Sequence, residues 1–290
     1  MKILIANSQA DVIERAIRFT LHFAEAVQGE ITIMGICQRT EQQHRLEKQI
    51  DELLPLFNGL PLVSVRTLIR SGDAVETIME EHKVEKYQLV VVGTYRNRRF
   101  RRARSQLIVR QLTRTLDVPL LVVPQPRDRL ERVLICTSGG RHGEVDVWTG
   151  GTLAARVGAS VTVLHVMSQL PLIAAAYVAD LTRDAAELME HQTREGTHLR
   201  RVLGILHECG LPDEKYRAKV RNGLVVDEII AEAREDDYDL VVIGAHEVPS
   251  DTAWNELREL LQDDITGRIL TQTRRPVLVV QSSGRGIRWP

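Results

Sequence analysis

The sequence predicts an α/β protein made of two tandem, doubly wound domains, each built on a five-stranded parallel sheet. Two observations support this fold class. Short, continuously apolar runs alternate with segments of helical spacing along the 290 residues, and such runs are typical of strands that helices cover on both faces. The whole pattern also occurs twice, and a chain of this length accommodates two domains of ordinary size.

The duplication is visible in three pairs of matching segments, which are Ile3–Ala6 with Val133–Cys136, Gln88–Gly93 with Asp239–Gly244, and Val118–Val123 with Arg275–Val280. Their offsets grow along the chain, so the second copy contains additional residues before its fourth strand. Pro124 and Pro126 begin a charged segment between the copies, which predicts a linker. We therefore expect domains at 1–126 and 130–282, with a helical insertion in the second domain near 168–212.

The expected elements follow the apolar runs in order. In the first copy these are strands at 2–6, 30–36, 62–68, 88–93 and 119–123, and helices near 10–27, 40–56, 73–84 and 105–115. In the second copy they are strands at 132–137, 160–166, 214–220, 239–244 and 276–281. Asp73 directly precedes a segment with helical spacing, so it is expected to cap that helix.

Composition excludes several classes of function. Lys and Arg number 38 against 39 Asp and Glu, which leaves no global field for holding nucleic acid or an anionic membrane. The three cysteines (Cys37, Cys136 and Cys209) lie far apart without a CxxC pair, which argues against a disulfide framework or a thiolate zinc site. The sequence also has neither a signal-peptide layout nor an apolar stretch of ~18 residues. A cytoplasmic protein is expected.

Several of these segments resemble the universal stress protein family. The likeness rests on the strand and polar turn at the start, on Arg70–Ile78, on Leu89–Gly93 and on Asp117–Val123, and it recurs in the second copy at Asp239–Gly244 and Pro276–Val280. The resemblance implies the universal stress protein fold, which is like that of the adenine nucleotide alpha hydrolases. It also implies that the last strands of the two domains, Leu120–Val123 and Val277–Val280, pair to form an intramolecular pseudo-dimer. Such pairing removes an exposed apolar sheet edge.

The resemblance further implies an ATP site, with an Asp after the first strand and a G-x-x-G-x9-G-[S/T] segment after the fourth, whose backbone amides hold phosphate. In the first copy, Ser8, after Asn7, occupies the Asp position. Gly93 is retained, but Arg96 replaces the second glycine and Gln106–Leu107 replace the Gly-Ser pair. The first copy therefore departs from the pattern.

The second copy departs further. Ser138 occupies the Asp position, Gly244 is followed by no second glycine at the expected place, and Asp263–Asp264 replace the Gly-Ser pair. A carboxylate ~4 Å from a phosphate charge costs about 4 kcal/mol at an effective dielectric near 20. Phosphate binding by the family's route is expected to be lost in this copy.

Two segments leave alternatives open. The run Arg96–Arg104 could hold an anion through Arg96, Arg98 or Arg99, or it could be a solvated basic loop, or one neutralised by Glu256, Glu259, Asp263 and Asp264 of the other half. The glycine-rich segment Thr137–Gly143 reads as a flexible turn, or as an anion contact through the backbone at Ser138, Gly139 and Gly140. Pyrophosphatase chemistry is disfavoured because that loop lacks its Asp-Ser half.

The remaining features predict no site. His191 and His198 are seven residues apart on one expected helical face without a third metal ligand, so a surface role is expected. Cys37 and Cys136 are expected to be buried small residues at strand ends. The insertion begins with the apolar run Leu170–Val178 and continues as a charged helix through Glu208. It either forms a partner face or packs over its own half.

The expected function is a non-enzymatic stress-response regulatory or scaffold protein without a cofactor. The alternative is an ATP-binding or other adenine-nucleotide sensor with a non-standard arginine loop, and a third, disfavoured reading is an adenylating enzyme. Expected partners are an unidentified protein or a second copy in a homodimer, while membranes are excluded and nucleic acid is disfavoured because only Phe100 offers a stacking surface. No catalytic or metal-binding residue is assigned. The residues expected at the nucleotide position, if it is occupied, are Asn7, Ser8, Gly93, Arg96, Arg98, Thr137, Ser138, Gly139, Gly140 and Gly244.

Overall fold

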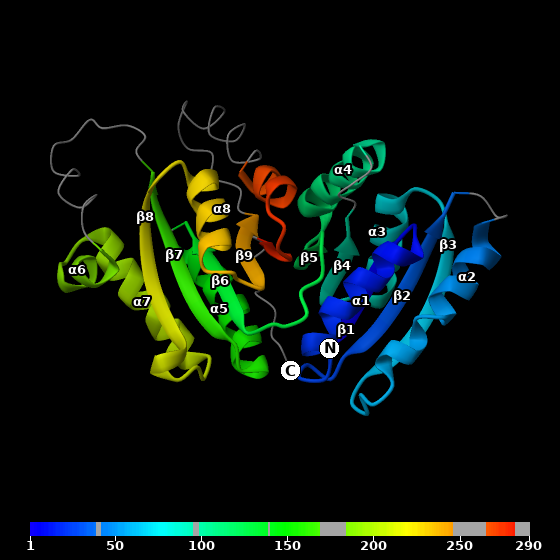
Figure 1. The fold of residues 1–290 in the computed structure, drawn as a ribbon, viewed down its shortest axis with the longest axis horizontal. Helices are drawn as coiled ribbons and strands as arrows, with labels where there is room; N and C mark the ends of the chain where they lie inside the picture. Colours follow the sequence, from blue (N-terminus) through cyan, green and yellow to red (C-terminus); the bar gives the residue numbers. More distant parts are fainter. Residues whose placement is uncertain (39–41, 95–98, 139, 169–183, 246–264, 282–290) are drawn as a thin grey trace. The chain divides into compact units, whose positions relative to one another are not determined.

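The computed structural model describes residues 1–290 except 39–41, 95–98, 139, 169–183, 246–264 and 282–290, and Figure 1 shows its ribbon. Its internal contacts divide the described residues into two compact units. The first unit contains residues 1–130 and 274–281, and the second contains residues 131–273. Within the described part of the chain, none of the helices combines the length and apolar character needed to cross a membrane.

The first unit is a mostly parallel sheet. Its strands are β1 (Lys2–Asn7), β2 (Glu30–Cys37), β3 (Ser64–Ser71), β4 (Leu89–Gly93), β5 (Leu120–Val123) and β10 (Val277–Gln281). They are arranged in the order β3-β2-β1-β4-β5-β10. The first five strands pair in parallel, as expected from their continuous apolar runs.

Helices cover both faces of this sheet. They are α1 (Ala10–Ala24), α2 (Gln43–Asp51) with the short 3-10 turn η2 (Leu54–Phe57), α3 (Ala74–Glu85) and α4 (Arg99–Thr115). The connections through α1 and α2 run in one direction across the sheet and those through α3 and α4 in the other. Because parallel crossovers are right-handed, the two pairs lie on opposite faces. As predicted, Asp73 caps α3, and its side chain accepts from the backbone N–H of Val75 and Glu76.

The second unit repeats this plan. Its strand order is β9-β6-β7-β8, and the strands are β6 (Arg132–Thr137), β7 (Ser160–Ser168), β8 (Tyr216–Gly223) and β9 (Leu240–Ala245), all parallel. The helices are α5 (Gly140–Val157), α6 (Ala185–Glu190), α7 (Arg194–Glu208) and α8 (Val225–Glu235), with the short 3-10 turn η5 (Asp213–Lys215) before β8. The strand order reverses between β1 and β4 in the first unit and between β6 and β9 in the second. In open α/β sheets, ligands bind at the carboxyl end of such a switch point.

The last strand of the chain pairs with the first half, as the family resemblance implies. β10 runs antiparallel to β5, with Leu278 opposite Leu121 and Val279 opposite Leu120. The side chains of Leu278 and Leu121 are 1% and 2% exposed. By its contacts β10 therefore belongs to the first unit, although by sequence it ends the second copy.

The described part of the insertion differs from the single helix that the sequence predicts. Two helices form, because Thr193 caps α7 by accepting from the Gly196 backbone N–H, and Asp184 and Glu187 form a capping box at the start of α6. Leu188 and Leu199 are fully buried in one cluster with Met167. Residues 184–208 thus pack over their own unit, while the apolar run Leu170–Val178 lies outside the described residues.

A polar cluster in the first unit ties β2 and β3 to α3. The guanidinium of Arg66 donates to Thr32 Oγ1 at 2.8 Å and to the Tyr87 hydroxyl at 3.0 Å. Tyr87, which is 2% exposed, donates to the Glu81 carboxylate at 3.0 Å. The cluster satisfies a buried hydroxyl and a buried carboxylate together.

The second unit contains the same cluster at the matching positions. Arg217 donates to Thr162 Oγ1 at 3.2 Å, and Tyr238 donates to Glu232 at 3.0 Å. Burial raises the pKa of Tyr238 to about 12. In this copy the Arg217 guanidinium also binds Asp236 at 2.7 Å. The duplication therefore extends from the apolar pattern to individual side-chain contacts.

Candidate functional site

The switch point of the first unit is bridged by a side chain. Asn7, at the end of β1, donates from Nδ2 to the Gly93 carbonyl at the end of β4, at 2.9 Å. The Asn7 carbonyl Oδ1 accepts from the Ser8 backbone N–H at 2.8 Å, and the Ser8 side chain is exposed. The structure thus brings Asn7, Ser8 and Gly93 together, with the polar groups of Asn7 used inside the protein.

Gly93 is needed for packing between β4 and α1. A Cβ at this position would lie 2.4 Å from Val12 Cγ1 and 2.5 Å from the Val12 carbonyl oxygen. Because backbone cannot move aside as a flexible side chain does, a larger residue is strongly disfavoured. This close approach accounts for the glycine without any ligand.

Replacing Gly93 by alanine is expected to lower the free energy of unfolding by about 1–3 kcal/mol because of this overlap. Urea denaturation followed by circular dichroism measures the change. The matched control is Gly204→Ala in α7, where an added Cβ meets nothing within 4 Å and helix propensity favours alanine by about 1 kcal/mol. A Gly93→Ala protein as stable as the parent would contradict the packing role.

The arginine-rich segment is partly helical, which corrects the prediction of a loop through Arg104. α4 begins at Arg99 rather than near residue 105. Arg96 and Arg98 lie outside the described residues, as do Glu256, Glu259, Asp263 and Asp264. With its amide oriented to satisfy its neighbours, Gln38 at the end of β2 accepts from the Arg104 guanidinium. One arginine of the segment therefore reaches the carboxyl edge of the sheet.

Because α4 begins earlier than predicted, it contains Gln106–Leu107, the positions that match the family's Gly-Ser pair. Both residues lie inside α4, which spans Arg99–Thr115, and Leu107 is 63% exposed. Only the first four N–H groups of a helix lack an intrahelical partner. The amides of residues 106 and 107 are therefore committed to the helix and are not available to an anion.

At the carboxyl edge of the second unit, two histidines converge on Thr137. The Thr137 carbonyl accepts from His165 Nδ1 at 3.2 Å, and its hydroxyl is 2.8 Å from His198 Nε2. The imidazole centroids are 5.7 Å apart. Gly143 of α5 fits against this hydroxyl, since a Cβ there would lie 2.2 Å from Thr137 Oγ1. This Thr137–His165–His198 group, called the histidine pair below, joins β6, β7 and α7.

The environment favours neutral imidazoles. Burial lowers the pKa of His198 to about 4, with smaller contributions from His165 and Arg194. Burial also lowers the pKa of His165, although the Thr137 carbonyl and Glu195 act in the opposite direction. Because a carbonyl only accepts, His165 carries its proton on Nδ1.

The other predicted residues of the second copy lie at the ends of several elements. Ser138 is exposed after β6, Gly140 begins α5, Gly244 is half-buried near the end of β9, and Gly139 lies outside the described residues.

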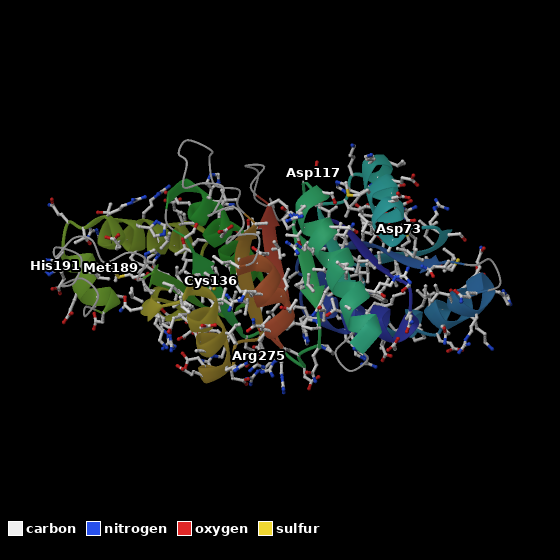
Figure 2. The ribbon with its side chains drawn as sticks, turned by 90° about the horizontal axis from the view of Figure 1, so that it is seen from above. Asp73, Asp117, Cys136, Met189, His191 and Arg275 are labelled. Atoms are coloured by element: carbon white, nitrogen blue, oxygen red, sulfur yellow. The ribbon has the colours of Figure 1, made fainter. Side chains whose placement is uncertain are left out.

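Two expectations for His191 and His198 are wrong. The two residues do not share a helical face, because His191 ends α6 and His198 lies in α7. His198 also has no surface role, since it is half-buried against Thr137, whereas His191 is exposed as expected. Figure 2 shows Met189 and His191 at the α6 end of the second unit and Cys136 within it.

A family model describes both copies. The universal stress protein family matches residues 1–124 and again residues 130–281. The chain belongs to the universal stress protein family. The second match ends on β10, so the strand that pairs with β5 is the final strand of the second family domain. The tandem organisation inferred from the repeats is confirmed.

Solved structures of related folds cover nearly the whole chain. A functionally unknown protein, PA1789 from Pseudomonas aeruginosa PAO1, is 17% identical over 97% of this chain and 92% of its own, with a TM-score of 0.64. A universal stress protein from Archaeoglobus fulgidus DSM 4304 is 14% identical over 97% and 96%, with a TM-score of 0.63. A comparison with curated proteins finds no match. At these identities the likeness establishes the fold.

The described residues of this universal stress protein hold no candidate metal centre, and the Cys136 thiol is not activated. No group of three or more His, Cys, Asp or Glu side chains there could hold a metal ion. All three cysteines are free, and Cys37 and Cys136 are buried as predicted. Burial, followed by the nearby carboxylates of Asp146 and Glu232, raises the pKa of the Cys136 thiol. A thiolate nucleophile is therefore disfavoured at Cys136.

Proposed function

We propose that this universal stress protein is a non-enzymatic regulatory or scaffold protein that does not hold ATP through the family's phosphate segment. The proposal rests chiefly on Gln106–Leu107, whose positions match the phosphate-binding Gly-Ser pair but lie inside α4. In the second copy the matching residues are Asp263–Asp264, which repel phosphate. The Asn7 bridge across the first switch point supports the same conclusion. A cytoplasmic location and an unidentified protein partner, or a second copy, belong to this proposal.

The alternative function is an adenine-nucleotide sensor that uses arginines in place of glycines. One observation favours it, which is that α4 begins within the arginine-rich segment and Arg104 reaches Gln38 at the carboxyl edge of β2. Guanidinium groups bind phosphate by paired hydrogen bonds and need no glycine. In this alternative Arg96 and Arg98 hold the phosphates.

Equilibrium binding of ATP, ADP and AMP at several salt concentrations tests the two functions. The proposal predicts no saturable binding up to millimolar nucleotide. Saturable, salt-sensitive binding that Arg96→Ala with Arg98→Ala abolishes would establish the alternative instead. The control is Arg114→Ala, an exposed arginine at the other end of α4. Binding that survives the double substitution would contradict both functions.

A further inference from the structure

We propose that the histidine pair is an acid-sensitive latch, which holds α7 against β6 and β7 at neutral pH and weakens this docking when the imidazoles take up protons. This conformational device goes beyond the proposed function, since it involves no nucleotide. The two imidazoles approach Thr137 from different elements, His165 from β7 and His198 from α7. The His198 contact, and with it the close approach of the two rings, therefore depends on α7 being docked.

The contacts of Thr137 show why protonation matters. His165 donates Nδ1–H to the Thr137 carbonyl, so a second proton would go to its Nε2. A proton added to His198 as well would place two cations on half-buried rings with centroids 5.7 Å apart. Like charges at this distance in a partly desolvated site repel strongly. Undocking α7 separates the rings and exposes them to water.

The charged groups around the pair act in both directions. On α7, Arg194 opposes protonation of both rings, and Glu195 favours protonation of His165. On α5, Glu144 is engaged with Arg201 of α7 at 3.5 Å. β8 places the apolar Val220 opposite His165. Asp146, also on α5, is buried and acts on the Cys136 thiol. His142 at the start of α5 and Glu187 and Glu190 on α6 are exposed.

The position of the pair makes α7 the element that responds. α7 packs against α5 and α6, and its apolar contacts include Leu199 in the cluster with Leu188 and Met167. α8 belongs to the same unit but connects β8 to β9, in the direction that places it on the opposite face of the sheet. A latch at the pair therefore loosens α7 and leaves α8 in place.

The direction of the pH effect follows from the two states. An exposed histidine has a pKa near 6.5, whereas docking lowers the pKa of His198 to about 4. The docked form is therefore fully favoured above about pH 6.5 and loses stability as the pH falls toward about 4. At about pH 5, His198 alone is expected to weaken docking roughly 30-fold relative to about pH 7.5.

Hydrogen exchange on the full chain, read by mass spectrometry and corrected for the intrinsic pH dependence of exchange, tests the latch. Protection of Arg194–Glu208 is expected to fall by about tenfold or more between about pH 7.5 and about pH 5. Protection of α8 is the reference within the same unit. An equal loss in α7 and α8, or no loss in α7, would overturn the proposal.

Variants separate the latch from general acid sensitivity. His198→Gln retains a polar group toward Thr137 but cannot be protonated, so it is expected to remove most of the pH response of α7. His191→Gln, at an exposed histidine that ends α6, is the matched control and is expected to retain the full response. If α7 of His198→Gln lost protection at low pH as fully as the parent does, the proposal would be contradicted.

A measurement on the unaltered chain covers the case in which His198→Gln fails to fold. Histidine-selective NMR labelling gives the titration curves of the individual rings. His198 is expected to titrate well below the value of about pH 6.5 that is typical of an exposed histidine. A His198 ring that titrates near pH 6.5, at about the value for exposed histidine, would remove the basis of the latch.

Discussion

Replacing Leu278 by aspartate is expected to lower the free energy of unfolding of the first unit by at least about 4 kcal/mol, because the new carboxylate is buried without a partner. Leu278 is 1% exposed in β10, directly opposite Leu121 of β5. An uncovered β5 edge also favours aggregation. Urea denaturation followed by circular dichroism measures the loss of stability, and light scattering detects association.

The control is Leu62→Asp, also in the first unit, where leucine is 55% exposed. An exposed site tolerates the charge, and the stability is expected to change by no more than about 0.5 kcal/mol. If Leu278→Asp were as mild as this control, the pairing of β10 with β5 would be wrong. The substitution thus tests the link between the end of the second family domain and the first unit.

Glu232→Ala is the second substitution with a large expected effect. It is expected to lower the free energy of unfolding of the second unit by about 3 kcal/mol, because the side chain is completely buried and its loss removes the carboxylate that pairs with Lys219 and Arg221. Its carboxylate lies 2.6 Å from Lys219 Nζ and 2.9 Å from Arg221 Nη1, and it accepts from the Tyr238 hydroxyl. Arg221 retains Glu228 and Glu235 as partners. The expected loss of stability is therefore at the lower end of the range for breaking a buried ion pair. Denaturant unfolding of the purified variant measures this loss.

Two further substitutions provide comparisons for Glu232→Ala. Glu81 is the matching residue of the first unit, and its nearest cation is Arg66 at 3.2 Å. Glu81→Ala is expected to lower the free energy of unfolding by less than Glu232→Ala does. Glu208→Ala, at a side chain that is 53% exposed, is expected to be nearly neutral. A Glu232→Ala protein no less stable than Glu208→Ala would show that the buried network does not stabilise the unit.

The strands could be predicted from sequence because their signal is local and is present twice. Runs such as Leu89–Gly93 lack polar alternation, and the second copy repeats them in the same order. The start of α4 could not be placed, because the arginines that form its first turns carry no apolar periodicity and basic residues are unfavourable at a helix N-terminus. The break between α6 and α7 did have a signal, since Thr193 is a good N-cap residue.

The histidine pair was missed for a different reason. His165 and His198 are 33 residues apart on a strand and a helix, and only tertiary packing brings both to Thr137. A partial signal existed, because His165 is displaced by the same 130 residues from Gly35 as Leu134 is from Leu4. In the first copy α2 and β3 side chains would lie within 2.9 Å of a Cβ on Gly35. An imidazole at the matching place indicates that the second copy is packed differently there.

The bridge at Asn7 shows the limit of reading a binding motif from sequence. Asn7, Ser8 and Gly93 are predicted from the sequence as nucleotide contacts, and the structure joins Asn7 to Gly93 by a 2.9 Å hydrogen bond. Sequence could not reveal that the side chain bonds to the neighbouring strand end, because β1 and β4 are far apart in the chain. The same residues thus match a ligand-binding motif in the sequence but form an internal contact in the folded protein.

A crystal structure of the full chain grown with millimolar ATP and Mg²⁺ tests the central claim most directly. We expect no nucleotide at the carboxyl ends of β1 and β4 or of β6 and β9, with Asn7 still donating to Gly93 and Thr137 still between His165 and His198. An adenine nucleotide bound at either of these strand ends, with its phosphates on backbone amides, would contradict it.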